Sequence, residues 1–364
     1  MVDDMPAFQK SRYFLSWLPS LLPPLGNVLG GSWTMLYFGF AVAACALDWF
    51  VPKNRSKPAA SAAGRVATTL VLLGHVALHT AGVVSLLAGV ATGRIAGGWM
   101  IAAAVSTGLS AGLSGINVAH ELIHRSARSL RMLGLWNLLT CGYGHWMIEH
   151  VYGHHRHVGT ELDPATARRG ETVYWFFARN VVGQFIDALR IEAERLRRRR
   201  RAPYGLGNFV VRITLLESVL LIAVAAGIGP PAAAAWCLQA LVAVFLLEST
   251  NYMEHYGLTR TPGEPVRHAH AWQTDVVLDR ILWLELVRHA DHHVHASRPY
   301  PELESHAESP ELPTGYYGMF PVALVPSLWF RTVHPILDEH LARHRPAAGP
   351  ILFSAAPRFV GGLR

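Results

Sequence analysis

The sequence predicts an all-α membrane protein with about six transmembrane helices and a cytoplasmic helical cap. Of its 364 residues, 51% are hydrophobic and only 16% are charged, and the mean hydropathy is +0.24. Two water-soluble cores, the usual arrangement for this length, fit such a composition poorly. Polar residues gather instead in two long stretches, 120–209 and 253–364, which we expect to form the cap. Residues 1–364 are therefore expected to form a single integral-membrane domain.

Six apolar runs approach the roughly 20 residues needed to cross about 30 Å of hydrocarbon. In chain order they are 12–30, 33–52, 66–91, 97–119, 210–228 and 231–252. The first run is the weakest, because Pro19, Pro23 and Pro24 interrupt it. No cleavable signal peptide is expected, since Asp3 and Asp4 open the chain and no A-x-A site follows the apolar stretch.

Lys and Arg in the short loops predict the orientation, because loops rich in these residues stay in the cytoplasm. With both termini and the cap on the cytoplasmic side of the membrane, most of these charges fall on that side: Lys10, Arg12, Lys53, Arg55, Lys57, Arg65 and the run from Arg195 to Arg201. The opposite loops keep only Arg94 and the neutral turn Gly229-Pro230. The arginine run is explained most simply as a topology anchor that contacts lipid headgroups, with docking of an acidic redox partner as the alternative.

Charge and cysteine content exclude other classes of protein. The formal net charge of +7 does not indicate nucleic-acid binding, because the basic residues lie between apolar runs and form no patch with aromatic residues. Cys45, Cys141 and Cys237 lie in apolar surroundings without CxxC spacing. This pattern excludes a secreted disulfide scaffold and argues against a cysteine-ligated iron–sulfur or zinc site.

Twenty histidines are unevenly distributed, and four clusters in the polar stretches carry nine of them. The clusters are HELIH, EHVYGHH, NYMEHYG and RHADHH, and their nine histidines are His120, His124, His150, His154, His155, His255, His289, His292 and His293. In HELIH, the i,i+4 spacing places both imidazoles on one helix face. Nine ligands are too many for one ion and indicate two. Iron is favoured over zinc, because a structural zinc site needs only four ligands and a redox metal gives open positions a use.

Acidic residues accompany each cluster: they are Glu121, Glu149, Glu254 and Asp291. A metal-bound histidine usually donates its other ring N–H to a carboxylate or carbonyl group, so we expect these acids to orient the ligands. The sequence leaves open whether some of them bind metal directly. Asn251, one helical turn before His255, is a provisional neighbour of the site, as are Asp163 and Arg168.

Alternative interpretations remain for the histidines. HELIH alone matches the zinc-protease pattern HExxH, with Glu121 as general base, so an intramembrane zinc protease is the rival enzyme class. A non-catalytic metal carrier or haem-binding protein is a further alternative. For His75 and His79, which lie i,i+4 in the third run, we favour hydrogen bonds across helices. The histidines expected to flank the clusters are His145, His157 and His295, and those expected to be solvated are His268, His270, His306, His334, His340 and His344.

Together, these motifs give the sequence a resemblance to a known family, the integral-membrane di-iron alkane hydroxylases, which are relatives of xylene monooxygenase and the membrane fatty-acid desaturases. The resemblance rests on NVAHELIHR at 117–125, GYGHWMIEHVYGHHRHVGTELDPATARRGE at 142–171, NYMEHYGLTR at 251–260, RHADHHVHASRPY at 288–300 and ESPELPTGYYGM at 308–319. Soluble di-iron enzymes instead hold iron with Glu and Glu-x-x-His on bundle helices. Val287 and Ala290 stand where the alkane branch usually has Gln and Ser, which leaves room for the branch that hydroxylates methyl groups on aromatic rings.

The resemblance implies that the nine histidines bind two iron ions (Fe²⁺/Fe³⁺) and that O₂ is a co-substrate. The implied reaction converts the terminal methyl group of an alkane to a primary alcohol. Benzylic methyl hydroxylation and fatty-acyl desaturation or hydroxylation are the alternatives. The chain has no dinucleotide fingerprint and no cysteine set for an iron–sulfur centre, so its electrons must come from a partner. The resemblance implies rubredoxin with rubredoxin reductase, or an iron–sulfur reductase.

An alkane has no polar handle, so its recognition must depend on burial, at about 0.8 kcal/mol per methylene. A cavity between the spans would admit such a substrate from the lipid bilayer. Trp33, Tyr37, Phe38 and Phe40 are candidates for its wall, although a lipid-facing role is favoured for them.

Overall fold

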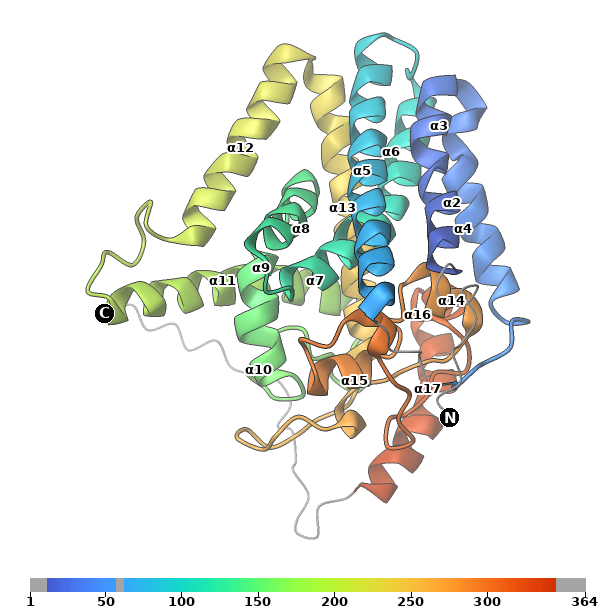
Figure 1. The fold of residues 1–364 in the computed structure, drawn as a ribbon, viewed down its shortest axis with the longest axis vertical. Helices are drawn as coiled ribbons and strands as arrows, with labels where there is room; N and C mark the ends of the chain where they lie inside the picture. Colours follow the sequence, from blue (N-terminus) through green and yellow to red (C-terminus); the bar gives the residue numbers. More distant parts are fainter. Residues whose placement is uncertain (1–11, 57–61, 345–364) are drawn as a thin grey trace.

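The computed structural model describes residues 12–56 and 62–344 and consists of helices joined by loops (Figure 1). Within these ranges the β-pairing is limited to two isolated bridges, Lys53 with Val276 and Gln273 with Glu311. The all-α prediction is therefore confirmed. Lys10 and Lys57, which contributed to the predicted orientation, lie outside the described residues, as does the Arg65 side chain.

Four helices in the described ranges are long and apolar enough to cross a membrane, and they correspond to four of the six predicted runs. They are α5 (Ala62–Ala91), the continuous helix Gly98–Ile123, α12 (Phe209–Gly227) and α13 (Pro230–His255). The second of these changes from α6 (Gly98–Ser110) through the π-helical segment η3 (Ala111–Asn117) to α7 (Val118–Ile123). In Figure 1, α12 leans away from the other three, in keeping with its low burial in the protein.

The first two predicted spans consist of shorter helical segments. They are η1 (Arg12–Ser16), α2 (Trp17–Ser20) and α3 (Leu22–Leu29), followed by η2 (Gly31–Met35) and α4 (Leu36–Leu47). The break at Leu21 precedes prolines in the first turn of α3. Proline is tolerated there because the first N–H groups of a helix have no intrahelical acceptor, so its missing N–H costs no hydrogen bond. In Figure 1, α3 and α4 stand beside α5 and α6. The count of six spans stays a prediction.

Helix α8 (Arg128–Thr140) does not lie in the cap, where its segment was expected. Its last residue, Thr140, lies against the middle of two spans. The Thr140 carbonyl oxygen accepts hydrogen bonds from Trp236 and Gln239 of α13, and its hydroxyl lies 2.6 Å from Nε2 of His79 on α5. The segment that follows HELIH therefore returns into the helix bundle before the chain enters the cap.

The remaining helices form a layer at one end of the spans, as Figure 1 shows. They are α9 (Trp146–Ile148), η4 (Glu149–His154), α10 (His155–His157), α11 (Val173–Arg198), η5 (His268–His270), α14 (Val277–Leu282), α15 (His289–Val294), η6 (Tyr300–Glu302), α16 (Tyr316–Ala323) and α17 (Pro326–Arg343). The loop after α4 lies against this layer, because Lys53 donates to the Leu312 carbonyl oxygen and Arg55 pairs with Glu311.

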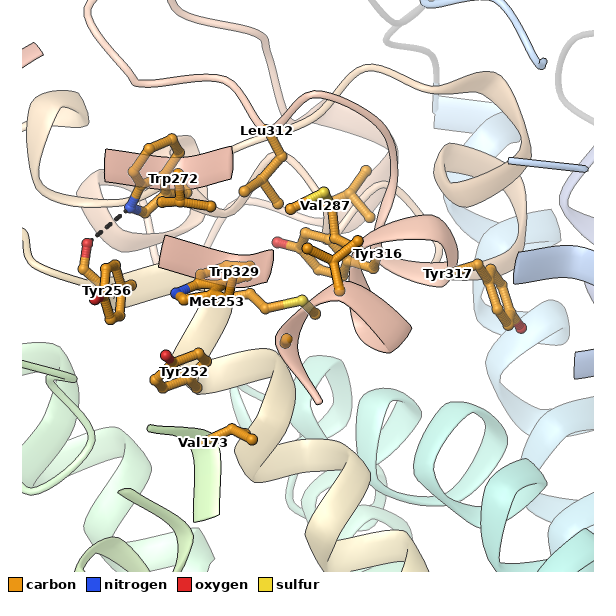
Figure 2. Close-up of a cluster of buried hydrophobic side chains, with 14 of the residues drawn as sticks. Val173, Tyr252, Met253, Tyr256, Trp272, Val287, Leu312, Tyr316, Tyr317 and Trp329 are labelled. Atoms are coloured by element: carbon orange, nitrogen blue, oxygen red, sulfur yellow. Dashed lines mark hydrogen bonds between the residues drawn. The ribbon is translucent and has the colours of Figure 1, made fainter. Parts of the chain in front are cut away.

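A buried cluster rich in aromatic residues joins this layer to the end of α13 (Figure 2). Tyr252 and Tyr256 of α13 pack against Trp329 of α17, with ring centroids 5.2 and 5.4 Å away. The Trp272 indole donates to the Tyr256 carbonyl oxygen over 3.0 Å, as Figure 2 shows. This packing fixes the last turn of α13, which ends at His255.

Candidate metal centre

The nine histidines predicted as ligands converge at the junction between the spans and the cap. They form two groups, within each of which one nitrogen per ring lies within 4.8 Å of the others. The five-histidine group contains His120, His124, His150, His155 and His292. The four-histidine group contains His154, His255, His289 and His293. His124 and His155 are partly exposed, and the other seven are buried.

Local helix geometry explains how neighbouring histidines reach different groups. The segment η4 is π-helical, and its i→i+5 hydrogen bonding brings residues five apart onto one side. The Nε2 atoms of His150 and His155 lie 3.0 Å apart, whereas His154 faces the other group. On α15, His289 and His293 are one turn apart and share a group, and His292 points to the five-histidine group. Spacing alone did not predict this division.

The ring nitrogens have the arrangement expected of metal ligands. Nε2 of His292 lies 2.7 Å from that of His120 and 3.1 Å from that of His155, and Nε2 of His289 lies 2.8 Å from that of His293. Two nitrogens that each lie about 2.1 Å from the same metal ion, with a right angle at the ion, are about 3 Å apart. The other ring nitrogens of His155, His292 and His293 are buried without a hydrogen-bond partner.

Burial favours the neutral form of His124, His150, His292 and His293, which is the form that binds a metal. Burial, with a smaller contribution from His154, lowers the pKa of His124 to about 4. The pKa values of His150, His292 and His293 are lowered further in the same direction, first by burial and then by the neighbouring imidazoles. Two groups of converging imidazole nitrogens fit two transition-metal ions.

The predicted carboxylates contribute unequally. Asp163 lies 3.0 Å from Nδ1 of His154, and Glu254 lies 3.3 Å from Nδ1 of His289. Burial alone would raise the pKa of Asp163, but the adjacent His154 and the Thr166 hydroxyl lower it overall. Asp163 is therefore placed to orient a ligand of the four-histidine group through a hydrogen bond, whereas Glu254 lies beside His289 without hydrogen bonding to it.

Glu121 and Glu149 do not hydrogen bond to the nine histidines. Glu121 pairs with Arg125 at 2.6 Å and accepts the Tyr300 backbone N–H. Glu149 is fully buried, and neither of its carboxyl oxygens has a hydrogen-bond partner. Burial, followed by the nearby Asp163, raises the pKa of Glu149 well above its usual value, which favours the neutral acid.

Asp291 faces away from the two groups, toward residues that were expected to be solvated or merely to flank the clusters. Its Oδ1 lies 2.9 Å from Nδ1 of His295, 3.1 Å from Nε2 of His306 and 3.4 Å from Nε2 of His268. Arg298 donates to the other oxygen of Asp291 at 2.6 Å. His268 and His306 are half-buried here, and His340 is buried against the Ala269 carbonyl oxygen, so the expectation that these three are solvated is wrong.

Sequence reasoning missed a buried polar network centred on Glu248 of α13. Tyr143, Asn180 and Gln184 donate to its carboxylate, and so does the predicted site residue Asn251, over 3.0 Å. A carboxylate inside a predicted span is a signal that could have identified this network. Arg168 makes no such contact, since its backbone N–H donates to Glu171.

The other buried histidines lie apart from the two groups. His75 lies 2.7 Å from the Ser16 hydroxyl and 3.2 Å from that of Ser20. His79 contacts Thr140, as described above. These contacts between helices match the interpretation favoured from the sequence. His145 is buried beside Tyr143 and belongs to neither group.

Two neighbouring cavities lie near the histidines, and only the smaller is lined by one of the nine. The smaller, about 20 Å³, borders His120, Asn251 and Glu254. The larger, about 140 Å³, has an almost wholly apolar wall from α4, α6, α13 and α16. Tyr37 and Phe38 line this larger cavity, whereas Trp33 is 55% exposed. Two of the four predicted wall residues therefore face a cavity, and Phe40 packs behind them against Tyr37 and Tyr317.

Comparison with known proteins places these features in a family context. The sequence profile of the fatty acid desaturase family matches residues 97–323. The chain is 38% identical over 250 residues to alkane 1-monooxygenase 1 of Pseudomonas aeruginosa, a match that covers 67% of this chain and 64% of the relative. It is 40% identical over 238 residues to alkane 1-monooxygenase 1 of Alcanivorax borkumensis, covering 64% and 58%.

The chain also resembles the xylene/toluene monooxygenase hydroxylase component XylM of Pseudomonas putida. The two are 31% identical over 328 residues, covering 88% of this chain and 87% of XylM. The chain thus spans less than two thirds of the length of the two alkane 1-monooxygenases and most of the length of XylM.

Proposed function

Because the chain belongs to the fatty acid desaturase family and to the alkane hydroxylase group within it, we propose that it is a membrane di-iron monooxygenase. Its proposed reaction inserts one oxygen atom of O₂ into the terminal methyl C–H bond of an alkane. The other atom leaves as water, and each turnover consumes two electrons and two protons. The observation that carries the proposal is the convergence of nine imidazoles beside an apolar cavity.

The residues present fit two iron ions. Each group offers four or five neutral nitrogen ligands and leaves room for a small molecule on an ion that takes six. Iron bound there would supply the activation of O₂. The chain itself holds the ligands in place, through Asp163 on His154 and Glu254 on His289, and excludes bulk water by burial. The nine histidines are the proposed ligands, and Asp163 and Glu254 the proposed orienting residues.

The larger cavity is the proposed binding site for the hydrocarbon. Its wall includes Tyr37, Phe38, Leu113 and Phe320, and contains almost no polar surface. Such a site recognises its ligand through burial and shape, because an alkane forms no hydrogen bonds. The cavity lies where α4, α6 and α13 meet α16 of the cap, so we propose that the substrate enters from the lipid bilayer between the spans.

A methyl-substituted arene is the second candidate substrate. At about 140 Å³ the cavity is close in size to a cavity of about 150 Å³ known to bind benzene. The match to XylM also extends over more of the chain than the matches to the alkane 1-monooxygenases. Both observations favour a compact substrate over a long, fully extended chain.

An acidic electron-transfer protein is the proposed partner, either rubredoxin with rubredoxin reductase or an iron–sulfur reductase. Support comes from an open groove of about 880 Å³ between α10 and the junction of α11 with α12. Six arginines line it: Arg156, Arg190, Arg195, Arg198, Arg199 and Arg212. One wall of the groove belongs to the segment that carries His150 and His155, so a bound donor would lie close to the metal site. We place this face in the cytoplasm of a bacterial cell, next to the inner membrane.

Metal analysis of the protein purified in detergent tests the reaction class. The proposal expects about two irons per chain and product formation that requires both O₂ and a reductant. One zinc per chain with activity independent of O₂ would instead support the intramembrane protease. Glu121, the base that such a protease needs, is paired with Arg125.

A whole-cell assay with octane, hexadecane and p-xylene, with products identified by mass spectrometry, tests the substrate. The proposal expects 1-octanol. A preference for p-xylene with 4-methylbenzyl alcohol as product would favour the second candidate. An alkene or no oxygenated product would contradict hydroxylation.

A further inference from the structure

Three side chains separate the two cavities beside the metal centre. Thr250 of α13, Trp283 and Tyr316 of α16 line both the apolar cavity and the small cavity next to His120. Trp283 is 5% exposed, and its ring packs edge to face against Tyr316, with centroids 5.6 Å apart. These residues therefore form a partition between the apolar cavity and the cavity that borders His120.

The small cavity sets the size of the group that can pass. Its volume of about 20 Å³ is the space of roughly one water molecule. A methyl group at the end of a chain is of similar size, whereas a methylene within a chain brings a carbon neighbour on each side. The partition is therefore built to discriminate between the end and the interior of a chain.

An unusual backbone bend holds Trp283 in this place. The next two residues, Leu284 and Glu285, have φ values of 54° and 58°, although neither is glycine. This left-handed conformation is unfavourable for residues with a Cβ atom, and it persists only where the surroundings impose it. The bend thus indicates that the position of Trp283 matters enough to be maintained against local preference.

Buried contacts on both sides impose the bend. The Glu285 carboxylate accepts from Arg280 at 2.7 Å and from the Tyr13 hydroxyl at 2.7 Å. On the other side, Asn117 of the π-helical segment η3 donates to the Trp283 carbonyl oxygen over 3.2 Å. The Trp283 backbone is therefore clamped between the N-terminal segment and the helix that carries His120.

Two polar groups of the partition differ in their hydrogen bonding. The Trp283 indole N–H is buried without a hydrogen-bond partner, an arrangement that is costly unless a ligand satisfies it. The Tyr316 hydroxyl donates to Glu254 over 2.8 Å, and Glu254 in turn lies 3.3 Å from His289. Tyr316 is thus engaged with the metal ligands, and the Trp283 N–H is free for a hydroxyl group that forms nearby.

We propose that Trp283 is the specificity-determining residue of this site: its ring admits the terminal methyl group alone, and its indole N–H binds the hydroxyl of the alcohol product. This inference rests on the proposed hydroxylase function and adds to it the selection of the carbon atom. Trp283 contacts substrate and product and leaves the ligands of the metal unchanged.

The size of the ring is tested by Trp283→Leu, with octane as the substrate and the ratio of 1-octanol to 2-octanol as the measurement. Removing the ring opens the partition, and we expect the ratio to fall about tenfold, because one methylene in a pocket changes discrimination by that order. Trp175→Leu is the matched control. Trp175 lies on α11, is 65% exposed and borders neither cavity, so its ratio should equal that of the wild type.

The N–H group is tested separately by Trp283→Phe, which keeps an aromatic ring. Binding of 1-octanol and of octane to the purified protein is measured by competition with a fluorescent fatty alcohol. Loss of one hydrogen bond should weaken 1-octanol binding about fivefold and leave octane binding unchanged. Because this variant preserves most of the packing, it also serves if the leucine variant does not fold.

The possible results separate this inference from the proposed function. If the wild type makes 1-octanol, and if Trp283→Leu binds iron but leaves the product ratio unchanged, the inference is overturned while the function stands. Equal weakening of octane and 1-octanol binding in Trp283→Phe would overturn the role of the N–H. If the wild type oxidises none of the hydrocarbons, the proposed function itself fails.

Discussion

The two halves of the metal centre are built from the same side chain but are supported differently. In the four-histidine group, Asp163 and Glu254 lie at the outer nitrogens of His154 and His289. In the five-histidine group, no carboxylate in the described part of the chain lies at hydrogen-bond distance from a ring nitrogen. Of the nine histidines, His120 of this second group lines the small cavity. The four-histidine group is thus the one with adjacent carboxylates, and the five-histidine group is the one that borders the small cavity.

This difference has a chemical consequence. A carboxylate at the outer nitrogen fixes the ring and makes the imidazole a stronger donor, so it strengthens metal binding. The five-histidine group can gain the same affinity from its additional ligand. We infer that the two groups reach similar occupancy by different routes, one through support of its ligands and the other through their number.

Removing one proposed ligand, from one group or from the other, should have the largest effect on the iron content. His255→Ala leaves its group with three histidines, whereas His124→Ala leaves four. We expect His255→Ala to bind about one iron per chain and to lose all hydroxylation, and His124→Ala to keep about two with weaker affinity. Elemental analysis of the purified proteins measures the difference, with the buried His79→Ala as the control. Equal losses in the two variants would contradict the division into groups of four and five.

Removing the support of one ligand should have a smaller effect, confined to one metal. Asp163→Asn leaves His154 without its charged partner and should weaken the metal of the four-histidine group about 10–100-fold. Competition with a chelator followed by metal analysis measures the affinity. Asp187→Asn is the control, since Asp187 is a carboxylate of α11 that contacts none of the nine histidines. If both variants behave alike, Asp163 does not act through His154.

The nine histidines singled out from the sequence come together in the structure, but the sequence did not predict how they divide into two groups. Short spacing identifies the members of each cluster, whereas the meeting of four clusters from distant parts of the chain depends on tertiary structure. The split between His154 and His155 follows from a π-helical turn, whose hydrogen bonding cannot be inferred from residue type. The sequence predicts that an acid lies near a histidine, but whether the two side chains face each other depends on tertiary packing.

The same limit applies to the fold. Four spans follow from composition and length alone. The return of α8 to Trp236 and Gln239 could not be predicted, because its polar contacts come from residues about a hundred positions away. The bend at Leu284 and Glu285 could not be predicted from the sequence either, since leucine and glutamate rarely adopt a left-handed conformation.

Glu121→Gln tests whether the acid of HELIH takes part in either group. Because Glu121 is paired with Arg125 and faces Tyr300, we expect the iron content and the hydroxylation rate to stay near the wild-type values. The loss of the buried partner of Arg125 should reduce stability by about 1–3 kcal/mol, visible as a lower Tm in detergent. Loss of hydroxylation with intact folding would contradict this expectation and would show that Glu121 acts on one of the two histidine groups.

The smallest effect concerns His145, a buried histidine outside both groups. Its substitution tests how much of the loss of stability at low pH comes from burial of a histidine that is not a proposed metal ligand. Burial lowers its pKa to about 4, whereas the unfolded chain has a pKa of about 6.5. Because the unfolded state binds the proton more readily, stability from this residue is complete above pH 6.5 and is lost as the pH falls toward 4. At pH 5 the loss is about 2 kcal/mol.

His145→Phe should remove this pH-dependent loss, since phenylalanine fits among Tyr143 and Phe185 without a proton to bind. The Tm of the metal-free variant should therefore fall less than that of the metal-free wild type between pH 7 and pH 5. An equal fall would mean that the acid sensitivity comes from the nine ligands alone, and that His145 is not protonated before the protein unfolds.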